Sequence, residues 1–361
     1  MSKRVTARIN LAALVNNCQQ IQTIAPHSNI LAMVKADAYG HGESEVANVL
    51  ESYVAGFGVA TLEEAEALRD AGINSSIVLL EGFNFPHELA IADELGLDLV
   101  IHHWDQLELL LSSSFNGVPK VWLKLDSGMH RLGFPIESWP AALERLKETR
   151  FSASAICMSH LACADEPDHA LNEQQVSAFQ SVVEELPNAK SIANSAAILS
   201  RPDLHFQWIR PGIMLYGVSP FGVQRVLSEY EPVMTLLASV IAIRKVEVGD
   251  AIGYGASYVC SQAKRIATVS IGYGDGYPRA AVSGTPCFIN GQRCEIVGRV
   301  SMDMITVDVS EVADVQLGDQ VELWGQNIRV EEVAEFCGTI AYELLTGLTG
   351  RVNYQYLRPP Q

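Results

Sequence analysis

Short hydrophobic runs alternate with amphipathic segments along the first two thirds of the chain. Eight of these runs are apolar or β-branched in the manner of buried strands. They cover residues 30–36, 56–62, 76–82, 97–103, 119–126, 154–162, 191–196 and 209–217. Helical patterns separate them, and eight strand-then-helix units over about 200 residues are what a (β/α)8 barrel needs. A doubly wound open sheet is the alternative that this alternation leaves open.

Residues with capping chemistry indicate where helices begin and end. Asn10 precedes an amphipathic segment and would cap an opening helix. Thr61 and Glu64 have the spacing of a capping box, and Gly72 stands where the same helix would end. These residues support helices between the predicted strands.

Beyond about residue 230 the pattern changes to strands joined by turns, with little helix. A hairpin over 287–297 would turn at Asn290-Gly291. The other strand-like stretches are 234–248, 265–274, 301–309 and 319–325. We therefore predict an α/β protein of two domains: a (β/α)8 TIM-type barrel over 1–228 and a mostly β domain over 229–361.

Composition and charge narrow the function classes. The chain has 361 residues, 48% of them hydrophobic and 19% charged, so it can fill a large core. With 25 Lys+Arg against 42 Asp+Glu, the net charge of -17 disfavours nucleic acid and anionic membranes as partners. An anionic ligand would have to be bound by a few placed arginines, backbone N–H groups or helix N-termini.

Cysteine spacing and the N-terminus give the expected compartment. The seven cysteines are scattered and never form a CxxC pair, so we expect reduced thiols and no metal site. The N-terminus lacks a signal-peptide pattern, and no run is long enough for a membrane span. The sequence therefore predicts a cytoplasmic protein. Motifs for a P-loop, a zinc peptidase, a nucleophile elbow and a dinucleotide fingerprint are all incomplete.

The first candidate for chemistry is Lys35, at the end of the apolar run 30–36. Barrel enzymes keep their catalytic groups at the carboxyl ends of the strands. A charged lysine there is unfavourable, so the side chain is expected either to pair with an acid or to be neutral. A neutral amine is a nucleophile able to form a Schiff base. A salt-bridged lysine at the strand mouth is the alternative.

The segment VKADAYGHG (34–42) closely resembles the cofactor-lysine motif of the alanine racemases, which use pyridoxal 5′-phosphate (PLP). Further motifs of that family follow in its order, nearly from end to end of the chain. They are LKLDSGMHRLGF (123–134), MSHLACAD (158–165), ANSAA (193–197), RPGIMLYG (210–217), GYGASY (253–258), GYGDGYPR (272–279), GRVSMDM (298–304) and AYE (341–343). The family fold, a PLP-binding barrel and a β domain, agrees with the pattern above.

The resemblance implies two bases. Lys35 would hold PLP and then act on the D-side of the substrate, and Tyr254 would act on the L-side from the other subunit of a homodimer. Racemisation suits this division, because a proton leaves one face of Cα and returns on the other. An ordinary tyrosine pKa near 10 means that Tyr254 needs help from a neighbouring donor or positive charge. Taken alone, Tyr254 would be an aromatic residue at a turn.

The resemblance also assigns the cofactor contacts. Arg210 would hydrogen-bond the pyridine nitrogen, although a phosphate or carboxylate clamp is equally natural for arginine. His160 would stack near the ring, in a hydrogen-bond chain between the catalytic tyrosine and Arg210, although a packed core histidine is the plainer interpretation. The phosphate would be held by Ser195, Gly212, Ile213, Tyr39 and Tyr342.

Substrate recognition is implied for a third group of residues. Arg131 would contact the cofactor's phenolic oxygen and the substrate carboxylate, and Lys124 matches a lysine that is often carbamylated in the family. The alternative for Lys124 is an ordinary ammonium paired with an acid. The backbone of Met302 would form the substrate-carboxylate site from the other subunit, with Asp303 as its supporting neighbour, and Tyr273 would guard the substrate channel.

These implications predict a homodimeric alanine racemase with shared active sites, used for peptidoglycan synthesis or for alanine catabolism. A serine-preferring or broad-specificity racemase is the nearest alternative. A PLP decarboxylase is disfavoured because Arg210 replaces the carboxylate that such chemistry favours. A PLP-binding protein without turnover would have no use for the domain that carries Tyr254.

Overall fold

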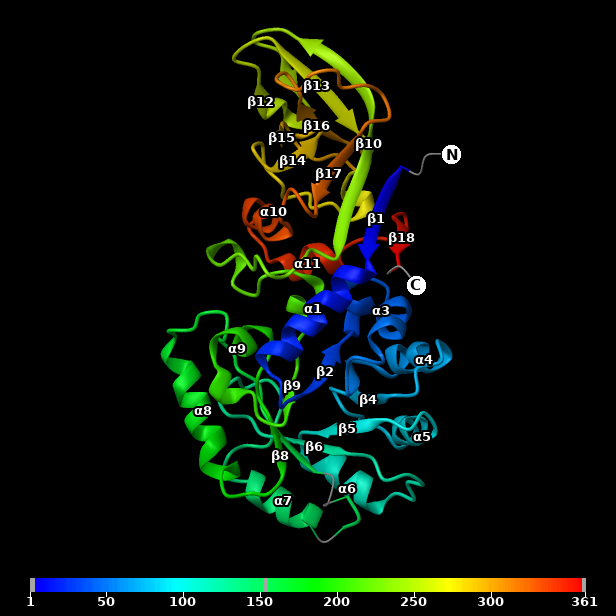
Figure 1. The fold of residues 1–361 in the computed structure, drawn as a ribbon, viewed down its shortest axis with the longest axis vertical. Coiled ribbons are helices and arrows are strands. Elements are labelled where there is room, and N and C mark those ends of the chain that lie inside the picture. Colours follow the sequence, from blue (N-terminus) through cyan, green and yellow to red (C-terminus); the bar gives the residue numbers. More distant parts are fainter. Residues whose placement is uncertain (1–3, 148, 152–154, 359–361) are drawn as a thin grey trace. The chain divides into compact units, whose positions relative to one another are not determined.

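The computed structural model describes residues 4–147, 149–151 and 155–358 (Figure 1). Its chain divides into two compact units. One contains Cys18–Leu215, and the other joins the described residues up to Asn17 to those from Tyr216 onward. This division differs from the consecutive domains predicted, 1–228 and 229–361, because the N-terminal strand pairs with strands from the second half of the chain.

Eight parallel strands form a nearly closed barrel in the unit Cys18–Leu215 (Figure 1). They pair in the order β8-β7-β6-β5-β4-β3-β2-β9, and a parallel bridge between Asn194 and Arg210 links the segments that follow β8 and β9. The strands are β2 (Asn29–Met33), β3 (Gly56–Val59), β4 (Ser76–Leu79), β5 (Asp98–Ile101), β6 (Val121–Lys124), β7 (Ile156–Met158), β8 (Ala189–Ser191) and β9 (Trp208–Ile209). The predicted barrel is confirmed, and the doubly wound sheet is excluded.

Helices follow the strands around this barrel. They are α1 (Leu11–Ile24), which begins in the other unit, α2 (Lys35–Gly40), α3 (Glu43–Leu50), α4 (Leu62–Asp70), α5 (Pro86–Glu94), α6 (Trp104–Ser112), α7 (Trp139–Lys147), α8 (Ala170–Val183) and α9 (Ser195–Ser200). The predicted caps are confirmed. Asn10 Oδ1 accepts the N–H of Ala12 at 3.1 Å, Thr61 and Glu64 form a capping box, and Gly72 follows α4 with a φ of 87°.

Each of the eight barrel strands is shorter than the run predicted for it, the last three among them. The run over β7 starts at residue 154, which lies outside the described residues. β8 ends at Ser191, so the rest of the predicted strand 191–196 leaves the sheet and enters α9. β9 ends at Ile209, since Pro211 offers no N–H to continue a ladder.

Large side chains fill the barrel interior. The rings of Trp122 and Trp208 meet edge to face with centroids 5.2 Å apart. A Cβ on Gly58 would lie 2.3 Å from the Met33 Cε, so glycine leaves the space that this side chain occupies. The interior is therefore a packed core that holds the strands in place, as in other barrels.

An eight-stranded sheet forms most of the other unit (Figure 1). Its order is β13-β16-β15-β14-β17-β10-β1-β18, and β13 also pairs with β10, so six of the strands form a closed ring. The strands are β1 (Val5–Asn10), β10 (Met234–Val246), β13 (Lys264–Val269), β14 (Pro286–Ile289), β15 (Gln292–Ile296), β16 (Ile305–Asp308), β17 (Gln320–Trp324) and β18 (Asn353–Leu357). A short ribbon pairs β11 (Ala251–Ile252) with β12 (Tyr258–Val259).

The predicted hairpin is confirmed, with Asn290 and Gly291 at φ values of 47° and 80° between β14 and β15. The expectation of little helix was incomplete, because α10 (Val330–Cys337) and α11 (Ala341–Thr346) lie near the end of the chain. None of the described helices combines the length and apolar character that crossing a membrane requires.

Candidate active site at the carboxyl ends of the barrel strands

Lys35 lies directly beyond β2, and a left-handed turn follows it. The strand ends at Met33, so Lys35 begins α2 instead of closing the strand as predicted. Residues Ala36–Tyr39 have φ values of 52–54° and ψ values of 38–54°. Left-handed backbone costs an L-residue about 1–2 kcal/mol. The surrounding structure must therefore hold this turn in place.

Side chains bind both ends of the turn. Glu64 Oε1 accepts the N–H of Ala36 at 2.7 Å. His41 Nδ1 lies 2.9 Å from the carbonyl oxygen of Tyr39. Burial lowers the pKa of His41 to about 4, so its ring is neutral and Nδ1–H can donate to that oxygen.

The amine of Lys35 lies among groups that favour its neutral form. Burial lowers the pKa of Lys35, and the positive charge of Arg131 lowers it further, against the opposing effects of Glu81 and Glu64. A salt bridge would raise the pKa, so the net effect is the opposite of the salt-bridged alternative. The amine is therefore suited to act as a nucleophile.

Lys124 is the last residue of β6, and it is buried, with 7% of its surface exposed. Burial lowers its pKa to about 8, and the charges of Arg210 and Arg131 contribute. Asp126 folds the following loop by accepting the N–H groups of Gly128 and His130, both at 3.0 Å. This loop carries Arg131, whose side chain is exposed.

Arg210 follows β9 and is buried, at 3% exposure. Its Nη1 donates to Ser191 Oγ at 2.6 Å, and its Nη2 donates to the Ser159 carbonyl oxygen at 2.6 Å. Nη2 also lies 3.2 Å from His160 Nδ1. Burial and the charge of Arg210 hold the pKa of His160 well below its usual value, so the imidazole is neutral and can accept this hydrogen bond.

Burial lowers the pKa of Arg210 to about 10, which still leaves the guanidinium charged at neutral pH. The oxygens that hold it belong to a hydroxyl and to backbone carbonyls, so these contacts do not neutralise its charge. Among the described residues, this geometry brings Arg210 and His160 together as the resemblance implied.

The expected phosphate-binding residues of the barrel also lie together. Ser195 Oγ accepts the N–H of Gly212 at 2.9 Å and that of Met214 at 3.4 Å. A Cβ on Gly212 would lie 2.5 Å from the hydroxyl oxygen of Tyr39, so a larger residue would displace that hydroxyl or the backbone. Burial raises the pKa of Tyr39 to about 12, which keeps the hydroxyl protonated. Ile213 begins a short 3-10 turn directly after this glycine.

The electrostatics of this end of the barrel favour an anion. The pKa of His160 is lowered by the charged forms of Arg210, Lys124, Arg131 and Lys35, so basic side chains gather near this ring within a chain of net charge -17. Their mutual repulsion would be relieved by a bound anion. The site therefore offers a nucleophilic amine, hydroxyl and N–H groups, and basic side chains. This combination fits a phosphorylated aldehyde such as PLP.

The other predicted residues belong to the β unit. Tyr254 lies in a short turn between β11 and β12, and 70% of it is exposed. A Cβ on Gly255 would lie 3.2 Å from Arg299 Nη1, so a guanidinium is beside this turn. Sequence reasoning missed Arg299, which is a cation of the kind that Tyr254 was expected to need.

Two loops of the β unit hold Tyr273 and Met302 close together. Tyr273 donates its N–H to Ser301 O at 3.1 Å, and Gly274 donates its N–H to Met302 O at 2.8 Å. A Cβ on Gly274 would lie 2.3 Å from Arg351 Nη1, the end of a flexible side chain, and 3.0 Å from Met302 O.

Asp303 follows Met302 and accepts a hydrogen bond from Arg351 Nη2 at 2.7 Å. Tyr342 lies elsewhere in this unit, on α11. The sequence motifs alone gave no sign of the contact between Asp303 and Arg351.

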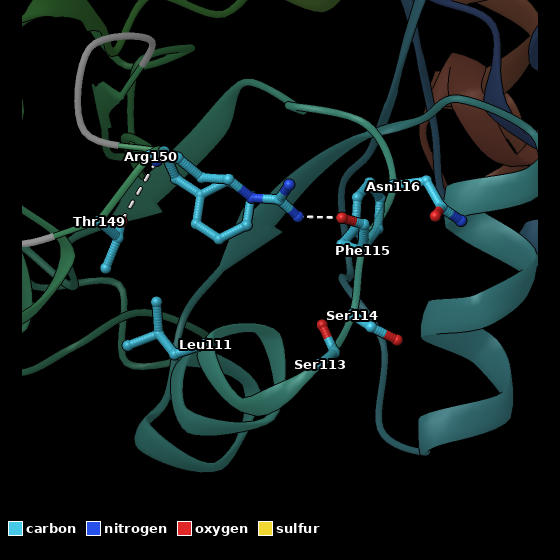
Figure 2. A pocket seen from close by; sticks show the side chains of 8 residues that line it. Leu111, Ser113, Ser114, Phe115, Asn116, Thr149 and Arg150 are labelled. Carbon is cyan, nitrogen blue, oxygen red and sulfur yellow. Dashed lines mark hydrogen bonds between the residues drawn. The ribbon is translucent and has the colours of Figure 1, made fainter.

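A surface pocket in the barrel unit lies away from this site (Figure 2). It lies where α6 and α7 lead into the amino ends of β6 and β7, the end of a barrel that serves stability rather than catalysis. Arg150 donates to the Phe115 carbonyl oxygen there (Figure 2). The lining residues are Leu111, Ser113, Ser114, Phe115, Asn116, Thr149, Arg150 and Phe151.

Sequence reasoning also missed residues that hold Arg210 and His160 by hydrogen bonds. Ser159 and Ser191 hold Arg210, and Gln175 of α8 donates to the His160 carbonyl oxygen at 3.0 Å. Ser191 holds Arg210 through its hydroxyl, whereas Ser159 holds it through a backbone carbonyl oxygen, for which the sequence carries no signal. In the part of the chain that the structure describes, no group of three or more His, Cys, Asp or Glu side chains could hold a metal ion.

Comparisons with known proteins match the chain over nearly its whole length. The models for the N-terminal and C-terminal domains of alanine racemase match residues 9–220 and 233–356. The alanine racemase of Stutzerimonas stutzeri is 47% identical over 98% of this chain and 99% of its own. The crystal structure of the biosynthetic alanine racemase from Pseudomonas aeruginosa has a TM-score of 0.94 and 44% identity, covering 99% of this chain and all of that one. The Bartonella henselae alanine racemase, solved with covalently bound pyridoxal phosphate, has a TM-score of 0.87 at 32% identity, covering 98% of this chain and 99% of that one.

Proposed function

This chain belongs to the alanine racemase family and is a PLP-dependent isomerase, and we propose that Lys35 and Tyr254 are the two bases with which it interconverts L- and D-alanine. The observation that carries the proposal is the placement of Lys35. Its amine has a lowered pKa and stands four residues before a hydroxyl that lies against Gly212.

Bound PLP supplies an electron-withdrawing ring that stabilises negative charge on the substrate Cα. Lys35 would hold the cofactor covalently through its neutral amine, and Arg210 would hydrogen-bond the pyridine nitrogen. The phosphate would be held by Tyr39, Ser195, Gly212 and Ile213 of the barrel and by Tyr342. Neutral donors suit this task, because they bind an anion without adding net positive charge.

Arg210 limits the reaction to racemisation. With a pKa of about 10 it remains protonated, so it donates a hydrogen bond and does not transfer its proton to the ring. A carboxylate beside the ring nitrogen would keep that nitrogen protonated and make the ring more electron-withdrawing. With Arg210 there instead, negative charge on the substrate Cα is stabilised less, which suppresses slower side reactions such as decarboxylation. His160, neutral and hydrogen-bonded to Arg210, would link this arginine to Tyr254.

Two groups on opposite faces of the substrate would move the proton. The Lys35 amine would remove the Cα proton from D-alanine and, in the opposite direction, would give a proton to that same face. Tyr254 would do the same for L-alanine, with Arg299 as the nearby positive charge. The substrate carboxylate would be bound by Arg131 and by the backbone of Met302.

Three supporting residues complete the site. Lys124 would react with carbon dioxide, and its carbamate would hold Arg131 in place. Asp303 would fix the loop of Met302 through Arg351, and Tyr273 would line the substrate channel beside it.

We propose a homodimer in which residues 229–361 of one subunit lend Tyr254, Met302 and Tyr273 to the barrel of the other. The exposure of the Tyr254 side chain supports active sites shared between subunits, because it leaves this phenol accessible to the barrel of a second subunit. We also propose a cytoplasmic enzyme that supplies D-alanine for peptidoglycan, as the Pseudomonas aeruginosa relative is called biosynthetic.

The function is tested by a spectrum of the purified protein and by detection of D-amino acids after incubation with each of a panel of L-amino acids. We expect the visible absorbance of lysine-bound PLP, and D-alanine that accumulates until both enantiomers are equal, since mirror images have equal free energy in water. Absence of that absorbance, or faster formation of D-serine than of D-alanine, would contradict the proposal.

A further inference from the structure

The carboxylate of Glu64 joins two loops at the carboxyl ends of neighbouring strands. One oxygen accepts the N–H of Ala36, the residue directly after Lys35, at 2.7 Å. The other oxygen accepts the N–H groups of Ala60 at 2.7 Å and Thr61 at 3.4 Å. Since β2 and β3 are parallel partners, the side chain connects the loops that leave both of them.

This contact goes beyond the capping of α4. The capping box is complete once Thr61 Oγ1 accepts the Glu64 N–H at 3.3 Å and the Glu64 side chain accepts the Thr61 N–H. The bond to Ala36 reaches a residue 28 positions away in sequence and adds nothing to the helix. It therefore serves the turn that follows Lys35.

The turn that Glu64 holds carries two residues of the proposed site. Lys35 precedes the left-handed residues, and Tyr39 is the last of them, with its hydroxyl against Gly212. Left-handed backbone in non-glycine residues persists only when neighbouring groups hold it. The Ala36 N–H is the first group of the turn, so its bond fixes where the turn begins relative to β3.

From these contacts we infer that Glu64 is a positioning residue, whose carboxylate holds the left-handed turn so that the Lys35 amine stays in register with the Tyr39 hydroxyl. The inference rests on the proposed function, in which these two groups hold the aldehyde carbon and the phosphate of one cofactor. When the bond to Ala36 is lost, the turn relaxes and the two groups no longer keep one arrangement. Small displacements of this kind lower a reaction rate strongly.

Glu64→Gln tests the inference, because it keeps the length of the side chain but leaves one accepting oxygen, so the N–H groups of either Ala36 or Ala60 and Thr61 face an NH2 group and the link between the two loops is broken. Glu63→Gln is the matched control, since Glu63 is exposed and one position earlier on the same helix. For E64Q we expect kcat per PLP-loaded subunit to fall roughly 10- to 100-fold in both directions. The KM for alanine should change little, and the dissociation constant for PLP should rise. E63Q should match the wild type in all three.

A role limited to helix capping would lower the thermal stability of E64Q without changing kcat per loaded subunit or PLP affinity, and that result would overturn the inference. Failure of the proposed function can be told apart from failure of this inference. In the first case the wild type itself would not racemise alanine, but the PLP affinities of E64Q and E63Q could still be compared.

Should E64Q not fold, hydrogen exchange of the wild-type holoenzyme supplies the measurement. The Ala36 residue is exposed, so its amide exchanges slowly only if the carboxylate holds it. Slow exchange supports the inference, and exchange at the rate of an open loop overturns it.

Discussion

At the scale of single residues, the proposed chemistry depends on groups whose protonation differs from that in water. Burial and neighbouring positive charge lower the pKa of Lys35 and Lys124, and the same causes keep His160 neutral. Arg210 stays charged despite its burial. An acidic protein thereby offers an anion one buried guanidinium and neutral donors, without needing a net positive surface.

Carbamylation of Lys124 is the first prediction at this scale. Carbon dioxide reacts with the neutral amine, and a pKa of about 8 leaves about one amine in ten neutral at pH 7, against about one in several thousand for an ordinary lysine. Because the amine loses its proton as the pH rises, the fraction of Lys124 present as carbamate should increase from about pH 6.5 to about pH 8.5 at constant dissolved carbon dioxide.

The measurement is 13C NMR of protein equilibrated with 13C-labelled carbon dioxide. Lys124→Met is the control and should lack the carbamate signal. A signal of equal size in both proteins, or none in the wild type, would count against carbamylation.

Gly212→Ala is the second prediction at the residue scale. The added Cβ would lie 2.5 Å from the Tyr39 hydroxyl, so that hydroxyl or the backbone must move. Strain of about 1–3 kcal/mol at this contact should weaken PLP binding about 5- to 150-fold. Gly350→Ala is the control, since no atom lies within 4 Å of its Cβ. Fluorescence titration with PLP measures both affinities, and equal values would argue against the phosphate cradle.

At the scale of elements, the loops after the strands carry the chemistry and the strands position them. The capping box of Thr61 and Glu64 could be predicted from spacing, because it is a local contact. The bond from Glu64 to Ala36 could not, since it depends on the pairing of two strands and on a left-handed turn in residues that are not glycine. Local propensity gives no signal for such a turn.

Asp275 makes a prediction at the element scale, because it joins the loops of the β unit. It is 1% exposed and accepts the Gly272 N–H at 3.0 Å, and its carboxylate lies 3.2 Å from both Arg4 and Arg351. Asp275→Asn should lower the free energy of unfolding by about 1–3 kcal/mol, less than for a fully buried pair because both arginines are half exposed.

The same substitution should raise the KM for alanine, since the loops that carry Tyr273 and Met302 lose their common anchor. Urea unfolding and steady-state kinetics measure the two effects. An unchanged unfolding midpoint together with an unchanged KM would contradict this role for Asp275.

At the scale of the whole molecule, the barrel could be predicted and the membership of the β unit could not. Each barrel strand pairs mainly with the next one along the chain, so periodicity and strand count are enough. The strand β1 pairs instead with β10 and β18, with Ala7 opposite Leu236 and Tyr354. Nothing in six residues near the N-terminus indicates partners so distant in sequence.

The proposed sharing of sites between subunits is tested by mixing two inactive variants. Lys35→Ala lacks the amine that holds PLP, and Tyr254→Phe lacks the opposite base. A mixed dimer would contain one site with both groups intact, so mixing should restore up to about a quarter of wild-type activity per subunit if subunits exchange freely. Absence of recovery, once mixed dimers are seen by native mass spectrometry, would exclude shared sites.

The central claim is that one base faces each side of the substrate, and isotope exchange in D2O with Tyr254→Phe tests it most directly. Mass spectrometry of recovered alanine measures deuterium uptake at Cα, starting from each pure enantiomer. The claim predicts that D-alanine still takes up deuterium through Lys35, while uptake into L-alanine falls by roughly a hundredfold or more. Equal uptake into both enantiomers would contradict it.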